Sequence, residues 1–310
     1  MHIFLSYLKD FFKSIHPALL AFCFVYAALI IFLNYRFGIE PKILNNITGG
    51  LQRFASFYLV YFCAFFIPYL VVILLKGTQV TGLKPLLLLV FIAPAIFALK
   101  VSFSGLSQVI ENNIDGSWGK YYGIIANLPS RLILVIISLI LVWWLGQYEK
   151  PFFGATVKGI NWKPYLLMLL IMIPLISWAS TQHDFLHTYP KMKKIYFILP
   201  LSSTPWLQRL LFELSYGIDF ITIELFFRGF LVLAFVRYAG QEAILPMAVF
   251  YCSIHFGKPL AECISSFFGG MILGIVVYRT GSITGGLIVH LGIAWMMEAG
   301  GYVGNILKHR

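Results

Sequence analysis

The sequence predicts an all-α fold: a polytopic transmembrane helical bundle with about eight or nine membrane-spanning helices. The first observation is composition, because 60% of the 310 residues are hydrophobic, 11% are charged and the mean hydropathy is +0.85. The second is that apolar runs close to the ~20 residues needed to cross a bilayer recur along the chain. The third is that the net charge of +11 is spread over short connections. That distribution favours anionic lipid headgroups as partners and excludes a nucleic-acid-binding face.

The N-terminal residues 1–16 predict an interfacial helix that leads into the membrane. Phe4 and Leu8 fall on one face of this helix, whereas Lys9 falls on the other. The apolar run 17–34 follows without a small-x-small cleavage site, so we expect a retained transmembrane helix and not a signal peptide.

Residues 17–310 are expected to form a single transmembrane domain, because no linker or internal repeat marks a boundary within them. Residues 101–129 and 181–208 are expected to be polar connections. All four cysteines lie in apolar runs and none forms a C-x-x-C pair, so they are expected to be small core residues. The further predicted spans are roughly 54–75, 84–100, 130–147, 164–180, 207–237, 243–256, 261–279 and 283–303.

Ionisable residues inside apolar runs are concentrated in residues 211–298. An ionisable side chain at bilayer depth costs roughly 2.5–3.5 kcal/mol even on insertion scales, so such residues usually line a polar cavity. The early spans carry none of them, and the last third of the chain is therefore predicted to hold a site. The residues concerned are Glu213, Asp219, Glu224, Arg228, His255, His290 and Glu298.

Glu224 and Arg228 are four residues apart, which places them on one helix face where they can pair. Such a pair can merely neutralise itself while it anchors neighbouring helices, and a lone buried histidine is usually a packing residue. His255 ends a predicted helix before a Gly-Lys-Pro turn, and His290 lies mid-helix among glycines. Two histidines beside a Glu–Arg helix favour a functional site.

The chemistry that this set of residues supports is hydrolysis. A carboxylate held by a cation can act as general base on a water molecule, and two imidazoles can position that water. Alternatively Glu224, His255 and His290 supply the ligand types of a divalent metal such as zinc, with a fourth position left open. The spacing does not separate the metal-dependent version from the metal-free one.

Three motifs in a fixed order carry a family resemblance: Glu224-Leu-Phe-Phe-Arg228, Tyr251-Cys-Ser-Ile-His255 and His290-Leu-Gly-Ile-Ala294. This set resembles the CPBP family of intramembrane proteases (CAAX protease and bacteriocin-processing, or Abi) over about residues 210–300. The resemblance implies a helical bundle in a bacterial inner or plasma membrane. It also implies an endopeptidase that uses a Glu/His-activated water on a membrane-associated peptide or protein. By the same resemblance the catalytic residues are Glu224, Arg228, His255 and His290.

Two positions depart from the family pattern. Ile223 stands where the family usually has the first of two adjacent glutamates, and Ala294 stands where an asparagine is common. Asp219 shares a helix face with Ile223, and Glu298 shares one with Ala294, so both are candidate compensating acids. They are otherwise cavity-lining or helix-end groups. The departures leave a second reading open: a catalytically silent relative that binds a membrane peptide, a lipid or a partner protein.

Two further alternatives carry less support. The segment His183-Asp184-Phe185-Leu186-His187 places two histidines four residues apart, but the zinc-protease pattern needs Glu in its second position and a stable helix. A transporter would also place charges in broken helices, but no internal repeat supports one.

Overall fold

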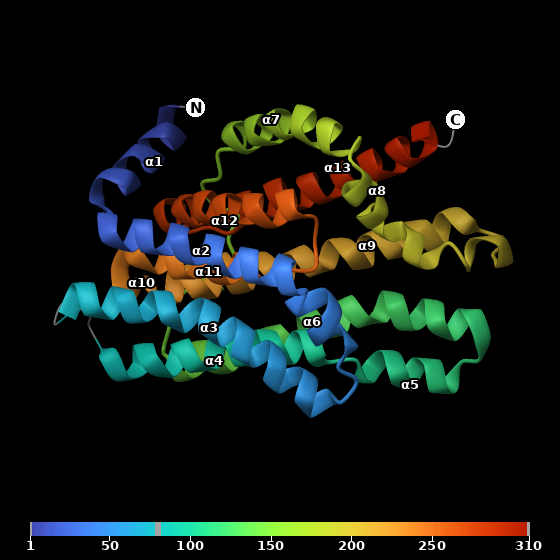
Figure 1. Ribbon diagram of the computed structural model, residues 1–310, viewed down its shortest axis with the longest axis horizontal. Helices are drawn as coiled ribbons and strands as arrows, with labels where there is room; N and C mark the ends of the chain where they lie inside the picture. The colour runs from blue at the N-terminus through green and yellow to red at the C-terminus, as the bar shows by residue number, and fades with distance from the viewer. Residues whose placement is uncertain (1, 78–81, 309–310) are drawn as a thin grey trace. The chain divides into compact units, whose positions relative to one another are not determined.

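The computed structural model describes residues 2–77 and 82–308, and within these ranges every regular element is helical (Figure 1). The expected all-α class is therefore confirmed over the described chain. Six helical segments in this part are long and apolar enough to cross a membrane. They are α2 (Pro17–Phe37), α3 (Gly50–Lys76), Leu83–Asn113 with α4 (Leu83–Ser102) and α5 (Gly105–Asn113), α6 (Gly116–Leu145), α12 (Leu260–Thr280) and α13 (Thr284–Lys308).

The expected count of eight or nine spans is not confirmed. Helix α11 (Ile244–Ser253) has 10 residues and covers only about 15 Å, half of a hydrocarbon core. Helix α9 (Pro205–Ile223) carries Arg209, Glu213 and Asp219 within its 19 residues. A seventh span would need helix α7 (Lys163–Ala179) to be joined to the following helical run across a 97° bend.

Two connections that the sequence suggested were polar are largely helical. Helix α5 and the first turns of α6 occupy most of residues 101–129. Residues 181–208 contain α8 (His183–Thr188) and the short 3-10 helices η5 (Lys191–Ile195) and η6 (Leu199–Leu201). Hydropathy alone misses such segments because they are helical in period and polar in composition. The expected N-terminal helix is present as α1 (His2–Ser14).

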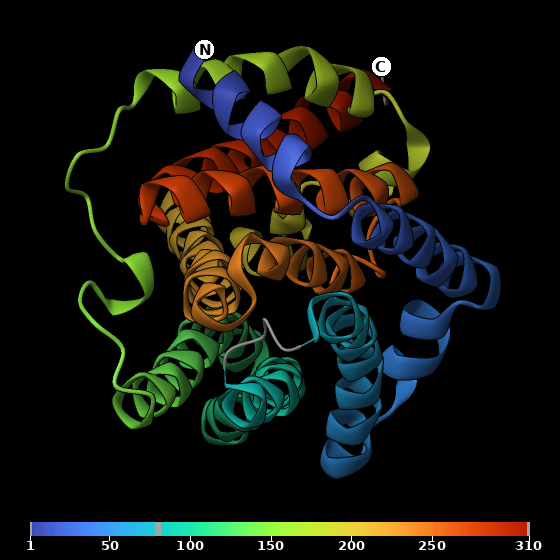
Figure 2. The ribbon, with the colours of Figure 1, turned by 90° about the vertical axis from the view of Figure 1, so that its left-hand side faces the viewer.

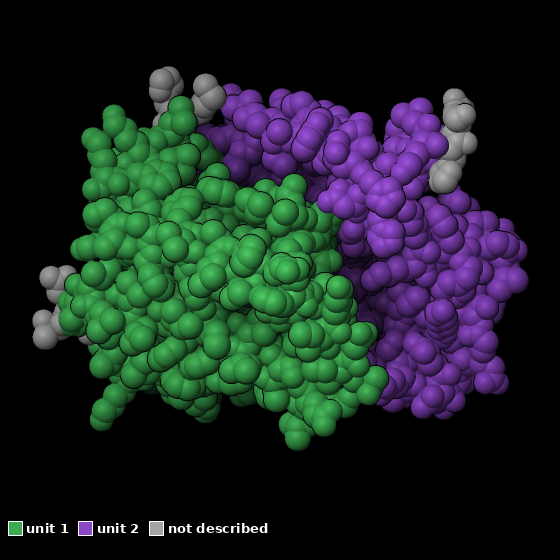
Figure 3. Space-filling view, viewed as in Figure 1, with its two compact units in different colours: residues 1–102, 138–158, 224–284 green, residues 103–137, 159–223, 285–310 purple. Residues whose placement is uncertain are grey.

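The chain divides into two compact units, coloured separately in Figure 3, and each is described by itself. Unit 1 contains Met1–Ser102, Ser138–Lys158 and Glu224–Thr284. Unit 2 contains Phe103–Ile137, Gly159–Ile223 and Gly285–Arg310. The residues of the predicted site are therefore shared between the two units.

An aromatic core holds unit 1 together. Helix α11 packs against α12, α3 and α2, and α3 lies beside α4 (Figures 1 and 2). At the centre, the Phe227 ring lies 5.1 Å from the Phe97 ring and 5.2 Å from the Phe250 ring, measured between centroids. Edge-to-face aromatic pairs at this separation add to the free energy gained by burial. This core fixes the segment that follows Glu224 against α4 and α11.

Glycines on α12 set how closely that helix approaches α11. A Cβ atom added at Gly270 would lie 2.8 Å from the Tyr251 ring, and one at Gly274 would lie 2.6 Å from the Met247 methyl. Small residues four apart permit such close packing of membrane helices. The absence of a side chain at Gly270 is what gives the Tyr251 ring its place.

Unit 2 is built on contacts of α9 and α13. The Tyr121 hydroxyl donates to the Gln208 carbonyl at 3.1 Å, and the Ser215 hydroxyl donates to the Ile125 carbonyl at 2.6 Å. These bonds join α9 to the first half of α6. A second apolar cluster packs α7 and α8 against α13; its members are Ile176, Phe185, Leu186, Tyr189, Ile293, Met296 and Met297.

Candidate active site

The first motif lies in an unusual helix. The sequence predicts one α-helix over 207–237, but the α-helix ends at Ile223 and a π-helix, η7 (Glu224–Ala234), replaces it. In a π-helix each amide bonds to the fifth carbonyl back, and such segments are rare and frequent at functional sites. The change of winding begins at Glu224, the first residue of the motif.

Glu224 and Arg228 form a fully buried ion pair. Arg228 Nη1 lies 3.1 Å from Glu224 Oε1, and the two side chains are 1% and 0% exposed. The pairing follows the spacing in the sequence. Removal of either partner would leave a buried charge without compensation, which is far more costly than loss of an exposed pair.

Tyr251 connects this pair to the second motif. The Arg228 Cζ atom lies 4.0 Å from the centre of the Tyr251 ring, in cation–π geometry. The Tyr251 and His255 rings are 4.7 Å apart and meet at 65°. Unit 1 thus brings Glu224, Arg228, Tyr251 and His255 into one connected group. Sequence reasoning treated Tyr251 only as a motif aromatic; its spacing four residues before His255 is the signal that it shares the histidine's face.

Backbone contacts determine which nitrogen of His255 can act chemically. Nδ1 of His255 lies 2.9 Å from the Tyr251 carbonyl oxygen. A carbonyl only accepts, so Nδ1 carries the proton and Nε2 carries the lone pair. Nε2 is therefore the nitrogen that can accept a proton or ligate a metal. A backbone carbonyl that fixes the tautomer of a histidine is a common feature of metal and catalytic sites.

The turn after His255 is short and sits between two buried cysteines. The Sγ atoms of Cys252 on α11 and Cys263 on α12 lie 3.8 Å apart. Cys23, Cys252 and Cys263 are buried, as expected of core residues, whereas Cys63 is half-buried. The two chain segments that flank the histidine turn therefore pack directly on each other.

The third motif belongs to unit 2. The His290 ring meets the Phe220 ring edge-on, with centroids 4.8 Å apart. Ala294, one turn further along α13, is 3% exposed. Because Glu224 and His255 lie in unit 1 and His290 lies in unit 2, their expected convergence on one cavity stays a prediction.

The two candidate compensating acids have different surroundings. Asp219 is half-buried on α9, in the same α-helix as Ile223. Glu298 is 6% exposed, and its two carboxylate oxygens accept the backbone N–H groups of Lys191 at 2.6 Å and Met192 at 3.1 Å. Glu298 thus caps the start of η5. A compensating role for either acid stays a prediction, and for Glu298 it would compete with two amide bonds.

The metal hypotheses rest on donor chemistry alone. Over its described residues, neither unit brings together three or more His, Cys, Asp or Glu side chains in a metal-binding group. Within unit 1 the available donors are Glu224 and His255, and the expected third donor is His290. In the competing segment, His183 and His187 are exposed on a helix of 6 residues, and Asp184 accepts the N–H of Phe185.

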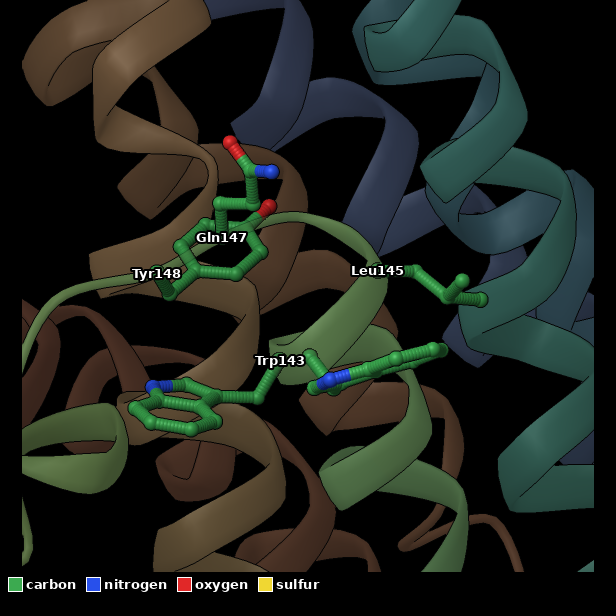
Figure 4. Close-up of a pocket in the computed structure, with 5 residues that line it drawn as sticks. Trp143, Leu145, Gln147 and Tyr148 are labelled. Carbon is green, nitrogen blue, oxygen red and sulfur yellow. The ribbon is translucent and has the colours of Figure 1, made fainter.

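A surface pocket of about 520 Å³ lies elsewhere in unit 1, at the end of α6 (Figure 4). Its lining includes Trp143, Trp144, Gln147 and Tyr148 and none of the predicted site residues. The Arg237 guanidinium lies 3.9 Å from the centre of the Tyr148 ring. Trp, Tyr and Arg at a helix end are typical of a membrane–water interface.

Comparison with known proteins fits this arrangement of helices and polar groups. Six long apolar helical segments in the described chain indicate a multi-pass membrane protein, and unit 1 holds the connected Glu–Arg–Tyr–His group. Residues 205–296 match the family model described as type II CAAX prenyl endopeptidase Rce1-like. The match covers the segment that carries the three motifs, so the predicted resemblance of this segment to the CPBP/CAAX proteases is confirmed. No curated protein and no solved structure matches the chain.

Proposed function

We propose that the protein is an intramembrane endopeptidase of the CPBP/CAAX-protease type, which hydrolyses a peptide bond of a membrane-associated peptide or protein. The observation that carries the proposal is the connected group in unit 1, in which Glu224, Arg228 and Tyr251 are buried and His255 is half-buried. It joins the first family motif to the second through Arg228 and Tyr251, with contacts of 3.1, 4.0 and 4.7 Å. We assign the enzyme to a bacterial plasma membrane.

In the proposed reaction Glu224 is the general base. Arg228 pairs with its Oε1 atom. The Glu224 carboxylate takes a proton from water while the water oxygen adds to the scissile carbonyl carbon. His255 Nε2 accepts a hydrogen bond from that water, and the His290 ring donates one to the developing oxyanion. When the tetrahedral intermediate collapses, the C–N bond breaks and Glu224 returns the proton to the leaving amine.

The same residues fit a metal-dependent version. A carboxylate oxygen and two imidazole nitrogens are ligand types that zinc accepts, with a fourth position open. A bound divalent metal would supply Lewis-acid activation of the water. Arg228 and Tyr251 would then orient the Glu224 carboxylate as second-sphere partners.

A second function is favoured by two specific residues. Ile223 and Ala294 are 7% and 3% exposed, and neither provides the carboxylate or the amide donor usual in the family. A protein that kept the family's cavity without these groups would bind a membrane peptide, a lipid or a partner protein and release it uncleaved.

The experiment uses the full chain in lipid nanodiscs with a prenylated peptide that ends in a CAAX sequence. We expect cleavage by the natural protein, and its loss in Glu224→Gln and in His255→Gln. The matched control is His183→Gln, an exposed histidine outside the group, which should retain cleavage. Binding of the peptide without cleavage, unaffected by added zinc, would favour the second function.

A further inference from the structure

The turn that carries His255 is held by a distant part of unit 1. Helix α11 ends at Ser253, and the His255 carbonyl accepts the Lys258 N–H at 3.0 Å, which ties the histidine to the next three residues. Helix ends leave backbone groups without helical partners, so such a turn depends on other groups for its order. Here those groups come from the end of α2 and from the following π-helix η1 (Ile39–Ile43), more than 200 residues earlier in the chain.

Two side chains at the end of α2 bind carbonyls of the turn. Asn34 is 0% exposed, and its Nδ2 atom donates to the Phe256 carbonyl at 2.9 Å. The Tyr35 hydroxyl donates to the Lys258 carbonyl at 2.5 Å. Both bonds fix the backbone within three residues of His255.

Glu40 completes the contact from η1. Its backbone N–H donates to Asn34 Oδ1 at 3.0 Å, so the buried amide of Asn34 is bonded at both ends. Its carboxylate accepts the Gly257 N–H, and a Cβ atom at Gly257 would lie 2.6 Å from Glu40 Oε1. A side chain at position 257 would therefore require the Glu40 carboxylate to shift.

The Asn34 amide serves as a hydrogen-bonding group and not only as a packing residue. Asn34 lies near the end of a 21-residue apolar helix, where a leucine would be buried at no polar cost. A buried amide is tolerated because both of its ends are bonded, and loss of one partner leaves the other unsatisfied. One of the two bonding partners of the Asn34 amide is the Phe256 carbonyl, in the turn that follows His255.

We propose that Asn34 and Glu40 are positioning residues for His255. They fix the backbone of residues 256–258, and through it the direction of the imidazole. This assigns a role to a part of the chain outside the family match at 205–296. The expected effect on peptide cleavage rests on the proposed function. The ordering of residues 256–258 by Asn34 and Glu40 does not.

The test compares Glu40→Ala, Glu40→Gln and Asn34→Leu in the full chain, with Glu149→Ala as the matched control. Glu149 is an exposed acid of unit 1. The first readout is hydrogen–deuterium exchange of the peptide 254–260. We expect Glu40→Ala and Asn34→Leu to speed its exchange about tenfold, because each removes a hydrogen bond that holds the turn. Glu40→Gln keeps an acceptor oxygen and should restore slow exchange, and Glu149→Ala should leave it unchanged.

The second readout is peptide cleavage. The fast-exchanging variants should lose about tenfold in kcat with little change in KM, and Glu40→Gln should rescue kcat. Exchange of 254–260 that stays slow in Glu40→Ala and Asn34→Leu overturns the proposal. So does fast exchange with an unchanged kcat. If the natural protein cleaves nothing, the proposed function fails, and exchange together with the NMR shifts of labelled His255 still decides whether these residues position it.

Discussion

The polar residues of the predicted site make different kinds of contact in the two units. In unit 1, Glu224, Arg228, Tyr251 and His255 contact one another through side chains. In unit 2, Glu298 is bound by two backbone amides, and His290 packs on a phenylalanine. A network of side chains can change its protonation and bonding during a reaction, whereas a carboxylate that caps a turn is committed to the fold.

This difference teaches how to read acids in a membrane protein. Burial alone does not distinguish them, because Glu224 is 0% exposed and Glu298 is 6% exposed. The bonding partners distinguish them: Glu224 contacts a cation that packs on an aromatic ring, and Glu298 accepts from backbone N–H groups. We therefore expect substitutions in the two groups to affect activity and stability in different proportions.

The largest expected effect comes from restoring the missing carboxylate of the family motif. If Ile223 marks a lost general base that Glu224 does not replace, Ile223→Glu should raise peptide cleavage by a factor of ~10²–10⁴, the usual contribution of a general base. Adjacent residues of an α-helix lie about 100° apart around its axis, and Ile223 is the last residue of α9, so a carboxylate at 223 reaches a different point from one at 224. The change is measured as the rate of peptide cleavage in nanodiscs. Ile223→Gln is the control, because it has a similar size without the charge. If Ile223→Glu folds normally and neither form cleaves, the binding function becomes the better account.

Loss of the buried cation is the next largest effect. Arg228→Ala should lower the free energy of unfolding by about 3–5 kcal/mol, because Glu224 would remain buried and unpaired. Thermal unfolding in detergent measures the loss. The matched control is Arg279→Ala, whose pair with Asp10 is 3.8 Å long and largely exposed, and which should cost less than about 1 kcal/mol. Equal effects of the two substitutions would contradict a buried pair in unit 1.

The acid of unit 2 should behave as a structural residue. Glu298→Gln keeps one of two acceptors for the η5 amides, so we expect a loss of about 1–2 kcal/mol in stability and retained cleavage. Glu111→Gln, an exposed acid of unit 2, should leave both quantities unchanged. Abolished cleavage in Glu298→Gln, with stability intact, would instead make Glu298 the compensating base.

The smallest expected effect is a pH dependence at Glu40. Burial raises the pKa of this carboxyl from 4.5 to about 7, against the opposing influence of the Gly257 amide, Lys258 and Arg53. Between these values the folded state holds a proton that the unfolded state has lost, so stability falls as pH rises from 4.5 to about 7. Allowing for partial exposure, we expect about 1 kcal/mol over this window. Unfolding at several pH values should show it in the natural protein and lose it in Glu40→Gln; an unchanged slope would place the titration elsewhere.

Local pattern was enough to predict the helical class, the pairing of Glu224 with Arg228 and the family of the last third. These features depend on amino-acid composition and on the spacing of residues that are close in the sequence, and both can be read from one sequence. Local pattern did not give the π-helix at Glu224, because the hydrophobic period of a sequence does not separate a short π-helix from the α-helix that precedes it. The predicted number of spans is not confirmed either, since the apolar run through α11 continues past the point where the helix ends at Ser253.

Long-range contacts were beyond the reach of the sequence. Asn34 and Phe256 are 222 residues apart, and Glu298 meets Lys191 across 107 residues. Asn34 resembles any polar residue at the end of a transmembrane helix, and Glu298 resembles an acid in a cavity. Their roles become evident only when the fold supplies their partners.

The central claim is that Glu224, His255 and His290 act on one water in one cavity. The most direct test is an experimental structure of the full protein in lipid nanodiscs, in which the Glu224 carboxylate, His255 Nε2 and the His290 ring are located. The account predicts that all three face a shared polar cavity within about 12 Å of one another, a span that a bridging water and its ligands can cover. Any two of them directed at lipid, or separated by more than that distance, would contradict it.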